Sequence, residues 1–305
     1  MGNVQSLWGG YGSIDRYELR GANVDRIIVK HIEPPGQSNH PRGWNTNFGH
    51  QRKLRSYEVE ATWYRDWSKL SDDHCRMPRC LAVYQDHQET LILLEDLDDA
   101  GFARRPTHIN LDAMIVCLQW LASFHMTFLG KAPEGLWHTG SYWHLETRPE
   151  ELEQLNDLSL KTSAEKIDQV LKDCPYQTII HGDAKLANFC FSGNLRSVAA
   201  VDFQYVGGGI GIKDVVYFIG SCLDEDACEK YENYLLQQYF QALRQAFIRN
   251  PDIQHITFDD LESEWRRLFP VAWTDFHRFL KGWSPGHWKI NSYSERLASQ
   301  VLSNL

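Results

Sequence analysis

The residues best suited to chemistry form one short run, His181-Gly182-Asp183-Ala184-Lys185-Leu186-Ala187-Asn188, and Asp202 follows fourteen residues after its end. Phosphoryl transfer needs a carboxylate that accepts the proton of the attacking hydroxyl, oxygen ligands for Mg²⁺, and a cation near the transferred group. Asp183 can be the carboxylate, Asn188 and Asp202 the metal ligands, and Lys185 the cation. This spacing favours phosphotransferase chemistry over a loop in which Asp and Asn only cap turns.

Short apolar strands are predicted on both sides of this run, at residues 178–180, 189–191 and 198–203. Ser192-Gly193-Asn194 is typical of a hairpin turn between the last two strands. The run therefore follows one strand and precedes a hairpin, and Asp202 lies near the end of the final strand.

The first hundred residues have a different pattern. Strands are predicted at residues 17–19, 26–32, 80–84 and 90–94, and a helix at residues 51–70. Residues 8–13 form a glycine-rich loop, and residues 33–50 contain enough Pro and Gly for a long loop that could act as a lid or an interface.

The acidic stretch at residues 95–99 marks the predicted lobe boundary, and mainly helical patterns follow it, at residues 111–129, 149–172, 224–249 and 258–280. These patterns predict an α+β protein with a β-rich N-lobe at residues 1–97 and a larger, mostly helical C-lobe at residues 98–305.

Composition excludes several functions. Lys plus Arg is 31 and Asp plus Glu is 40, so the formal charge is 31 − 40 = −9, which argues against nonspecific nucleic-acid binding. No apolar run is long enough to span a membrane. The seven cysteines match neither a zinc site nor a disulfide framework, so we expect a protein of the reducing cytoplasm.

The segment from His181 to Phe218 resembles the kinase-like small-molecule phosphotransferases, which include aminoglycoside phosphotransferases and choline kinases, and most closely the ecdysteroid-kinase-like group. Besides His-Gly-Asp, it contains Val201-Asp202-Phe203-Gln204-Tyr205 and Asp214-Val215-Val216-Tyr217-Phe218. The resemblance implies a two-lobed protein-kinase-like fold and the use of ATP and Mg²⁺. It also implies that Asp183 is the catalytic base, Lys185 a phosphate contact, and Asn188 and Asp202 the metal ligands.

The same resemblance assigns residues of the N-lobe to the nucleotide. Lys30 matches the strand lysine that contacts the phosphates. The pattern Glu-x-x-aromatic-Tyr selects Glu60 over Glu58 as the partner of Lys30. Backbone groups of Gly10 and Gly12 would cover the phosphates, although the full GxGxxG motif is absent. The connector would bind adenine through the Glu95 carbonyl and the Leu97 N–H.

In this fold the acceptor binds on the C-lobe, where an aromatic stretch offers candidates. Trp273, Phe276 and Leu280 recur at helical spacing and are expected in the core. The acceptor-pocket candidates are Asp275, Trp283, His287 and Trp288. Aromatic rings beside a carboxylate suit a cationic or a flat apolar acceptor.

Three other polar residues are expected to have structural roles: Asp214 as a helix N-cap, His181 in orienting the loop, and His125 as a core histidine. The sequence thus predicts an ATP- and Mg²⁺-dependent O-phosphotransferase for a small-molecule hydroxyl acceptor. One alternative is a protein kinase, although Gln204 stands where Asp-Phe-Gly has its glycine. Another is a noncatalytic nucleotide-binding scaffold.

Overall fold

The computed structural model describes residues 2–34, 47–86, 89–250, 253 and 256–305. The chain forms two compact units. One contains the residues up to Arg105 together with Cys190–Gln204, and the other contains Pro106–Phe189 and Tyr205–Leu305. Most of the predicted 33–50 loop lies outside the described residues.

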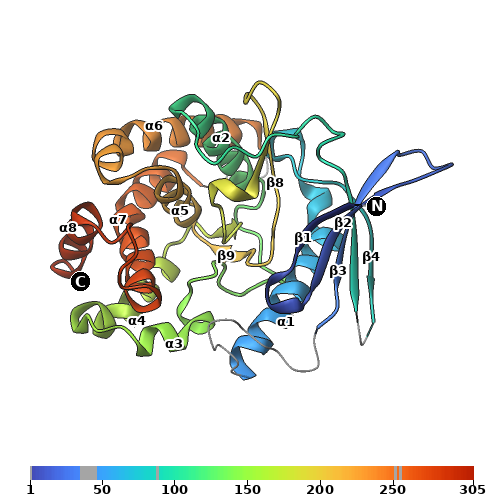
Figure 1. The fold of residues 1–305 in the computed structure, drawn as a ribbon. Coiled ribbons are helices and arrows are strands. Elements are labelled where there is room, and N and C mark those ends of the chain that lie inside the picture. The colour runs from blue at the N-terminus through green and yellow to red at the C-terminus, as the bar shows by residue number, and fades with distance from the viewer. Residues whose placement is uncertain (1, 35–46, 87–88, 251–252, 254–255) are drawn as a thin grey trace. The chain divides into compact units, whose positions relative to one another are not determined.

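The first unit is built on a five-stranded antiparallel sheet in the order β1-β2-β3-β5-β4 (Figure 1). Its strands are β1 (Gly2–Ser6), β2 (Gly12–Glu18), β3 (Arg26–Ile32), β4 (Cys80–Gln85) and β5 (Thr90–Glu95). The glycine-rich segment is the turn between β1 and β2, so the sheet includes a strand ahead of the glycines. Lys30 lies in the middle of the sheet, opposite Ile14 and Ile92.

Helix α1 (Asn47–Thr62) belongs to the same unit and continues into a π-helical turn, Trp63–Trp67, and two 3₁₀ turns, Ser68–Leu70 and Asp73–Cys75. The hairpin strands β7 (Phe189–Phe191) and β8 (Val198–Ala200) precede Phe203, whose ring stacks on Trp63 at 4.9 Å. This contact fixes the residue next to Asp202 against the end of α1.

The second unit is mainly helical. It contains α2 (Leu111–Thr127), α3 (Pro149–Glu153), α4 (Leu158–Lys172), α5 (Ile212–Cys222), α6 (Glu225–Arg249), α7 (Phe258–Trp283) and α8 (Ser292–Leu302), with strand β6 (Thr178–Ile180) paired to β9 (Gly207–Gly209). Several helices begin at Asn or Asp side chains that accept a backbone N–H of the first turn: Asn110, Asp157, Asp224 and Asn291. None of the helices in the described ranges is both long and apolar enough to cross a membrane.

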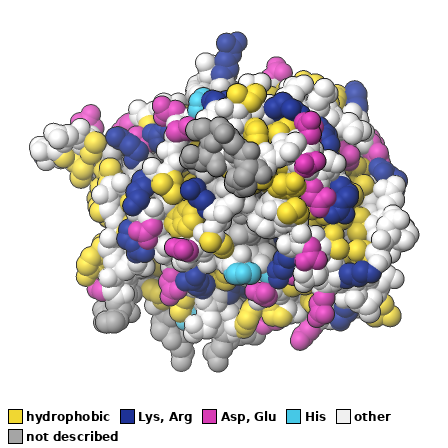
Figure 2. All heavy atoms as spheres, turned by 180° about the vertical axis from the view of Figure 1, so that it is seen from behind, with side chains coloured by type: hydrophobic (Ala, Val, Ile, Leu, Met, Phe, Trp, Pro, Cys, Tyr) yellow, Lys and Arg dark blue, Asp and Glu magenta, His cyan; other side chains and the backbone are white. Residues whose placement is uncertain are grey.

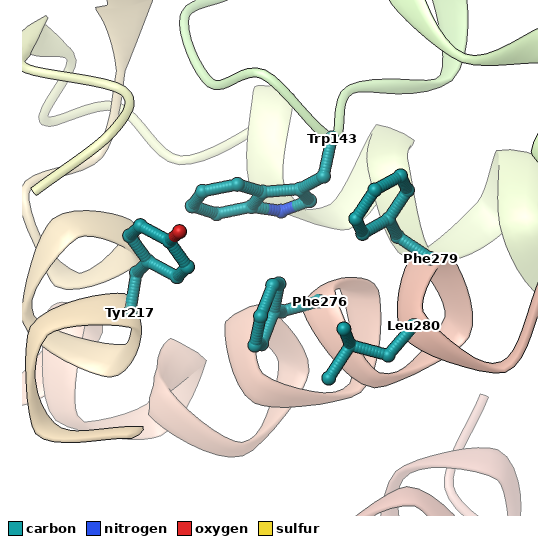
Figure 3. Packing of buried hydrophobic residues seen from close by; sticks show 5 residues of the cluster. All are labelled: Trp143, Tyr217, Phe276, Phe279 and Leu280. Carbon is teal, nitrogen blue, oxygen red and sulfur yellow. The ribbon is translucent and has the colours of Figure 1, made fainter. Parts of the chain in front are cut away.

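An aromatic cluster lies in the core of this unit (Figure 3). Trp143, from the segment before α3, meets Tyr217 of α5 and Phe276 of α7 at ring separations of 4.9 and 5.2 Å. Phe279 and Leu280 complete it. Phe276 and Leu280, together with Trp273, are buried, which confirms the predicted core stripe.

Several predicted boundaries were wrong for local physical reasons. The helix predicted from residue 51 begins at Asn47, and the segment predicted as one helix at 149–172 is two, because Asp157 caps a new helix by accepting Leu160 N–H. The strand predicted to reach residue 203 ends at Ala200, since Asp202 has a left-handed backbone with φ 68°. Helices α5 and α8 were not predicted as whole elements.

Candidate functional site

The run that begins at His181 forms a tight loop between β6 and β7, and this loop belongs to the second unit. Lys185 Nζ lies 2.7 Å from Asp183 Oδ2. Asn188 donates its side-chain N–H groups to the Asp183 carbonyl at 2.8 Å and to Asp183 Oδ2 at 3.1 Å. These bonds use the amide nitrogen of Asn188, so its oxygen, the atom that ligates cations, is not consumed by them. The loop thus gathers three of the predicted site residues around one carboxylate.

The Asp214 carboxylate holds this loop by accepting two of the loop's backbone N–H groups. Its two carboxylate oxygens accept the N–H groups of His181 at 2.6 Å and Gly182 at 3.0 Å, and one of them lies 3.1 Å from His125 Nε2. The prediction of an N-cap was wrong: Gly211 occupies the cap position of α5, and Asp214 lies in the first turn. Its role is still structural, and His125 is a fully buried core residue, as expected.

Gly182 must be glycine for steric reasons. Its φ of +78° lies in the left-handed region, and a Cβ atom there would stand 2.0 Å from the Tyr205 carbonyl oxygen and 2.7 Å from the Ser141 nitrogen. Any larger residue would therefore displace two neighbouring backbone segments. The sequence indicated the motif but not this cause.

Two tyrosines adjoin Asp183, the buried Tyr217 and the partly buried Tyr142. Burial, and then the charge of Asp183, raises the pKa of Tyr217 well above its usual value, and this hydroxyl is hydrogen-bonded to both Asp183 and Tyr142. The backbone N–H of Tyr142 also bonds the Gly182 carbonyl at 3.1 Å. Tyr217 keeps its proton at neutral pH, so its hydroxyl can donate a hydrogen bond to Asp183. Sequence reasoning gave Tyr217 no role.

In the first unit, Lys30 and Glu60 form a buried ion pair with Nζ–Oε2 2.5 Å. Glu58 is exposed and lies beside Arg55, so the geometry favours Glu60 as the partner. Burial raises the pKa of Glu60, while the charge of Lys30 acts in the opposite direction. Lys30 Nζ is also 4.0 Å from Asp202 Oδ1, which brings together three predicted residues from a strand, a helix and the hairpin.

Gln204 connects Asp202 to α1. Its Nε2 donates to Asp202 Oδ1 at 2.7 Å, and its Oε1 accepts from Lys53 Nζ at 2.9 Å and Ser56 Oγ at 3.2 Å. The sequence analysis noted Gln204 only as the missing glycine of Asp-Phe-Gly. A signal for its role was its place two residues after a predicted metal ligand.

The two predicted glycines of the β1–β2 turn differ. The Gly10 N–H donates to the Leu7 carbonyl at 3.3 Å, and nothing lies near its Cβ position. A Cβ on Gly12 would stand 2.0 Å from the His31 carbonyl oxygen, so strand pairing alone requires glycine there. These contacts leave the expected binding of phosphate by the Gly10 and Gly12 backbone a prediction.

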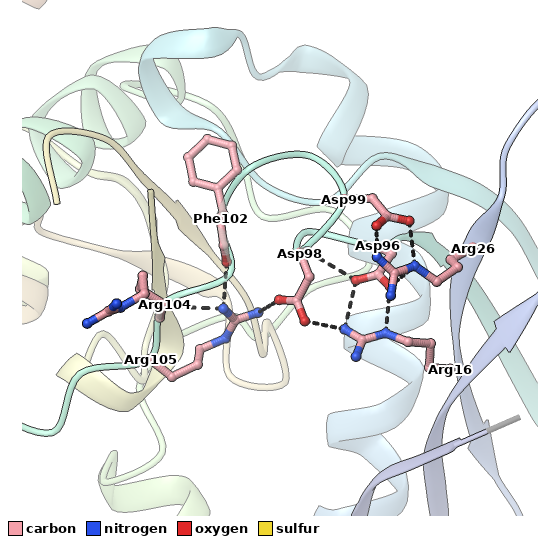
Figure 4. A network of polar contacts seen from close by, with 8 residues as sticks. All are labelled: Arg16, Arg26, Asp96, Asp98, Asp99, Phe102, Arg104 and Arg105. Atoms are coloured by element: carbon pink, nitrogen blue, oxygen red, sulfur yellow. Dashed lines mark hydrogen bonds and ion pairs between the residues drawn. The ribbon is translucent and has the colours of Figure 1, made fainter. Parts of the chain in front are cut away.

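The connector residues are fixed by charge pairs. Glu95 pairs with Arg76 at 2.5 Å and Arg79 at 3.3 Å, and the Leu97 side chain is buried against Cys190 and Ala199. Figure 4 shows how Arg16 of β2 and Arg26 of β3 hold the carboxylates that follow, Asp96, Asp98 and Asp99. The Glu95 and Leu97 side chains are thus occupied by contacts within the first unit.

The acceptor-pocket candidates separate into two kinds. Asp275 is fully buried and paired with Lys213 at 3.2 Å and Arg278 at 2.8 Å, and it accepts the Trp143 indole N–H. These contacts explain it as a structural charge linking α5 and α7, which removes it from the candidates. Trp283, His287 and Trp288 form a run of neighbouring rings, and Trp288 is 57% exposed.

The predicted site residues divide between the units. The first unit contains Gly10, Gly12, Lys30, Glu60, Glu95, Leu97 and Asp202, and the second contains Asp183, Lys185, Asn188, Asp275, Trp283, His287 and Trp288. No group of three or more His, Cys, Asp or Glu side chains in the described parts of the chain could hold a metal by itself. Asn188 and Asp202 offer amide and carboxylate oxygens, the donors that suit Mg²⁺ when phosphates and water supply the remainder.

Comparison with known proteins identifies what this chain is similar to. Residues 135–249 match the model of the ecdysteroid kinase-like family, and the match includes the loop of Asp183 and the clamp of Asp214. A comparison with curated proteins finds no match. The family match confirms, over residues 135–249, the resemblance that the sequence analysis drew from the loop of Asp183.

Two solved structures share the fold. The amicoumacin kinase hAmiN, in complex with AMP-PNP, Ca²⁺ and Ami, has a TM-score of 0.61 and 13% identity, with 98% of this chain and 86% of that chain covered. A microcompartment-associated aminopropanol kinase has a TM-score of 0.50 and 14% identity, with 97% and 90% covered. At such identities the likeness is one of fold, and it confirms the predicted kinase-like α+β class.

Proposed function

We propose that this protein is an ATP- and Mg²⁺-dependent phosphotransferase that transfers the γ-phosphoryl group to a hydroxyl of a small molecule. The observation that carries the proposal is the loop geometry, in which Asp183 has Lys185 2.7 Å and Asn188 3.1 Å from one carboxylate oxygen. The family match over residues 135–249 supports the same reaction class. We further propose that the protein is cytoplasmic, since its cysteines are all free.

In this reaction Asp183 accepts the proton of the acceptor hydroxyl while the hydroxyl oxygen forms a bond to the γ-phosphorus and the bond from that phosphorus to ADP breaks. Tyr217 donates to Asp183 and fixes the direction of the carboxylate. Lys185 forms an ion pair with the carboxylate in the resting protein, and its proposed role is to balance phosphoryl charge.

Asn188 and Asp202 are the proposed metal ligands, and Mg²⁺ bound there would neutralise phosphate charge. Lys30, held by Glu60, is the proposed contact for the α- and β-phosphates. Backbone groups of Gly10, Gly12, Glu95 and Leu97 complete the proposed nucleotide contacts. A protein kinase remains the alternative that peptide phosphorylation would favour.

The test is ADP release with Mg-ATP and a panel of acceptors: choline, ethanolamine, an aminoglycoside, sterols, sugars, hydroxy acids and a generic peptide. We expect one small-molecule class to stimulate release, and Asp183→Asn to reduce the acceptor-dependent rate by at least about a thousandfold. Asp173→Asn, an exposed carboxylate at the end of α4, is the control.

Equal rates for the wild type and Asp183→Asn would contradict the assignment of the base. ATP-dependent thermal stabilisation without turnover on any acceptor would favour the noncatalytic scaffold.

A further inference from the structure

Lys289 has no role in the proposed mechanism, and it lies among three aromatic rings, here called the aromatic box. Its Nζ is 5.6 Å from the ring centres of Tyr217 and Phe276 and 5.4 Å from that of Trp288. These rings come from α5, α7 and the segment after α7. The box of three aromatic faces that could take a cationic ligand therefore already contains the protein's own ammonium group.

The box adjoins the proposed base. Tyr217 presents its ring to Lys289 and its hydroxyl to Asp183, so a single side chain joins the two groups. Asp183 and Lys185 both act electrostatically on Lys289. All of these residues belong to the second unit. Lys289 is thus linked to the proposed base through Tyr217.

The amine lacks a counter-ion. Among the residues that the structure describes, no carboxylate forms an ion pair with Lys289, whereas the buried Lys213 of the same unit pairs with Asp275 at 3.2 Å. The groups that face the amine from the packed elements are the rings above, the thiols of Cys222 and Cys228, Lys185 and Asp183. Burial, the largest effect, lowers the pKa of Lys289 to about 8. A half-buried cation of this kind is stabilised by an anion that arrives with a ligand.

We infer that Lys289 is the acceptor-specificity residue of this protein and that the acceptor carries an anionic group, such as a carboxylate, sulfate or phosphate, besides the hydroxyl that is phosphorylated. The inference rests on the proposed function and deepens it. It reverses the expectation of a cationic acceptor, because a second ammonium in the box would be repelled by Lys289 and Lys185.

The first test compares ligands that carry an anionic, a neutral or a cationic group at the same position of one skeleton: glycerate, glycerol and 3-aminopropane-1,2-diol, and cholate, its neutral amide and its amine analogue. Binding is measured by thermal shift with AMP-PNP and Mg²⁺ present. We expect the carboxylate of one skeleton to bind at least about tenfold more tightly than its neutral and cationic partners. Lys289→Met should abolish this preference, and Lys289→Arg should retain part of it.

Lys230→Met is the matched control, because Lys230 also lies over a ring, that of Tyr231 at 4.9 Å, but is exposed on α6. A preference for the cationic ligands, or an equal preference in the wild type and Lys289→Met, would overturn the inference. A loss of AMP-PNP affinity in Lys289→Met without a change in acceptor preference would assign the amine to the nucleotide phosphates and would overturn it too.

A second test uses the wild-type protein and needs neither folding of a variant nor turnover. Pyridoxal 5′-phosphate and pyridoxal differ by one phosphate, and each forms an imine with an amine, releasing water, which borohydride then reduces to a stable secondary amine. Peptide mass spectrometry measures labelling of Lys289 relative to Lys230. We expect the phosphate to increase relative labelling of Lys289 about tenfold or more, in the presence of saturating AMP-PNP as well as in its absence.

Equal relative labelling by the two aldehydes would overturn the inference even if no ligand of the panel binds. Protection of Lys289 by AMP-PNP would do the same. Because labelling is independent of phosphoryl transfer, it distinguishes a failure of this inference from a failure of the proposed function, which the ADP-release assay decides.

Discussion

The Gln204 side chain links Asp202, a proposed metal ligand, to helix α1. Its amide bonds Asp202 on one side and Lys53 and Ser56 of α1 on the other, so the orientation of the proposed metal ligand depends on the helix that also carries Glu60. We expect Gln204→Ala to weaken Mn²⁺ binding, measured by electron paramagnetic resonance with AMP-PNP, by roughly tenfold. The KM for metal should rise more than kcat falls.

Gln169→Ala is the control for this prediction, because Gln169 bonds Asp173 at 2.6 Å in the same manner but on the exposed surface of α4. Unchanged Mn²⁺ affinity in Gln204→Ala would contradict the positioning role. At this scale the sequence predicted the carboxylates, the amide and the lysines, since their types and spacing carry the chemistry. It did not predict Gln204, Tyr217 or Lys289, because their roles depend on which side chains meet in space.

At the scale of elements, Asp214 joins α5 to the loop of Asp183 and, through His125, to α2. Asp214→Asn replaces one acceptor with a donor that faces backbone N–H groups in a fully buried place. We expect this variant to lower the free energy of unfolding by about 2–3 kcal/mol, measured by chemical denaturation. Asp224→Asn, at the exposed N-cap of α6, should change it by less than about 0.5 kcal/mol, because Asn caps as well as Asp.

If Asp214→Asn lowers the free energy of unfolding no more than Asp224→Asn does, the loop of Asp183 does not depend on the Asp214 carboxylate.

The strands and long helices could be predicted because apolar periodicity records which face is buried. The break before Asp157 and the end of β8 before Asp202 could not, since a cap and one left-handed residue decide them. The contacts of Asp214 could not be predicted either, because its place after Gly211 suggested a helix cap.

At the scale of the whole molecule, stability comes from packing without covalent cross-links. All seven cysteines are free thiols, and five of them are buried. We expect the same melting temperature with and without dithiothreitol. Alkylation in denaturant without reductant should modify seven thiols per chain, and a smaller number would reveal a disulfide. On the face drawn in Figure 2, basic and acidic side chains are interspersed.

The steric fit of Gly182 has a consequence for descent. Most protein kinases have arginine where this loop has glycine, yet here a single codon change to any larger residue would push against Tyr205 and Ser141 at once. A lineage could pass from one loop to the other only by moving both neighbouring segments in the same period. Evolutionary substitution of this glycine would therefore require coordinated changes in three segments of the chain.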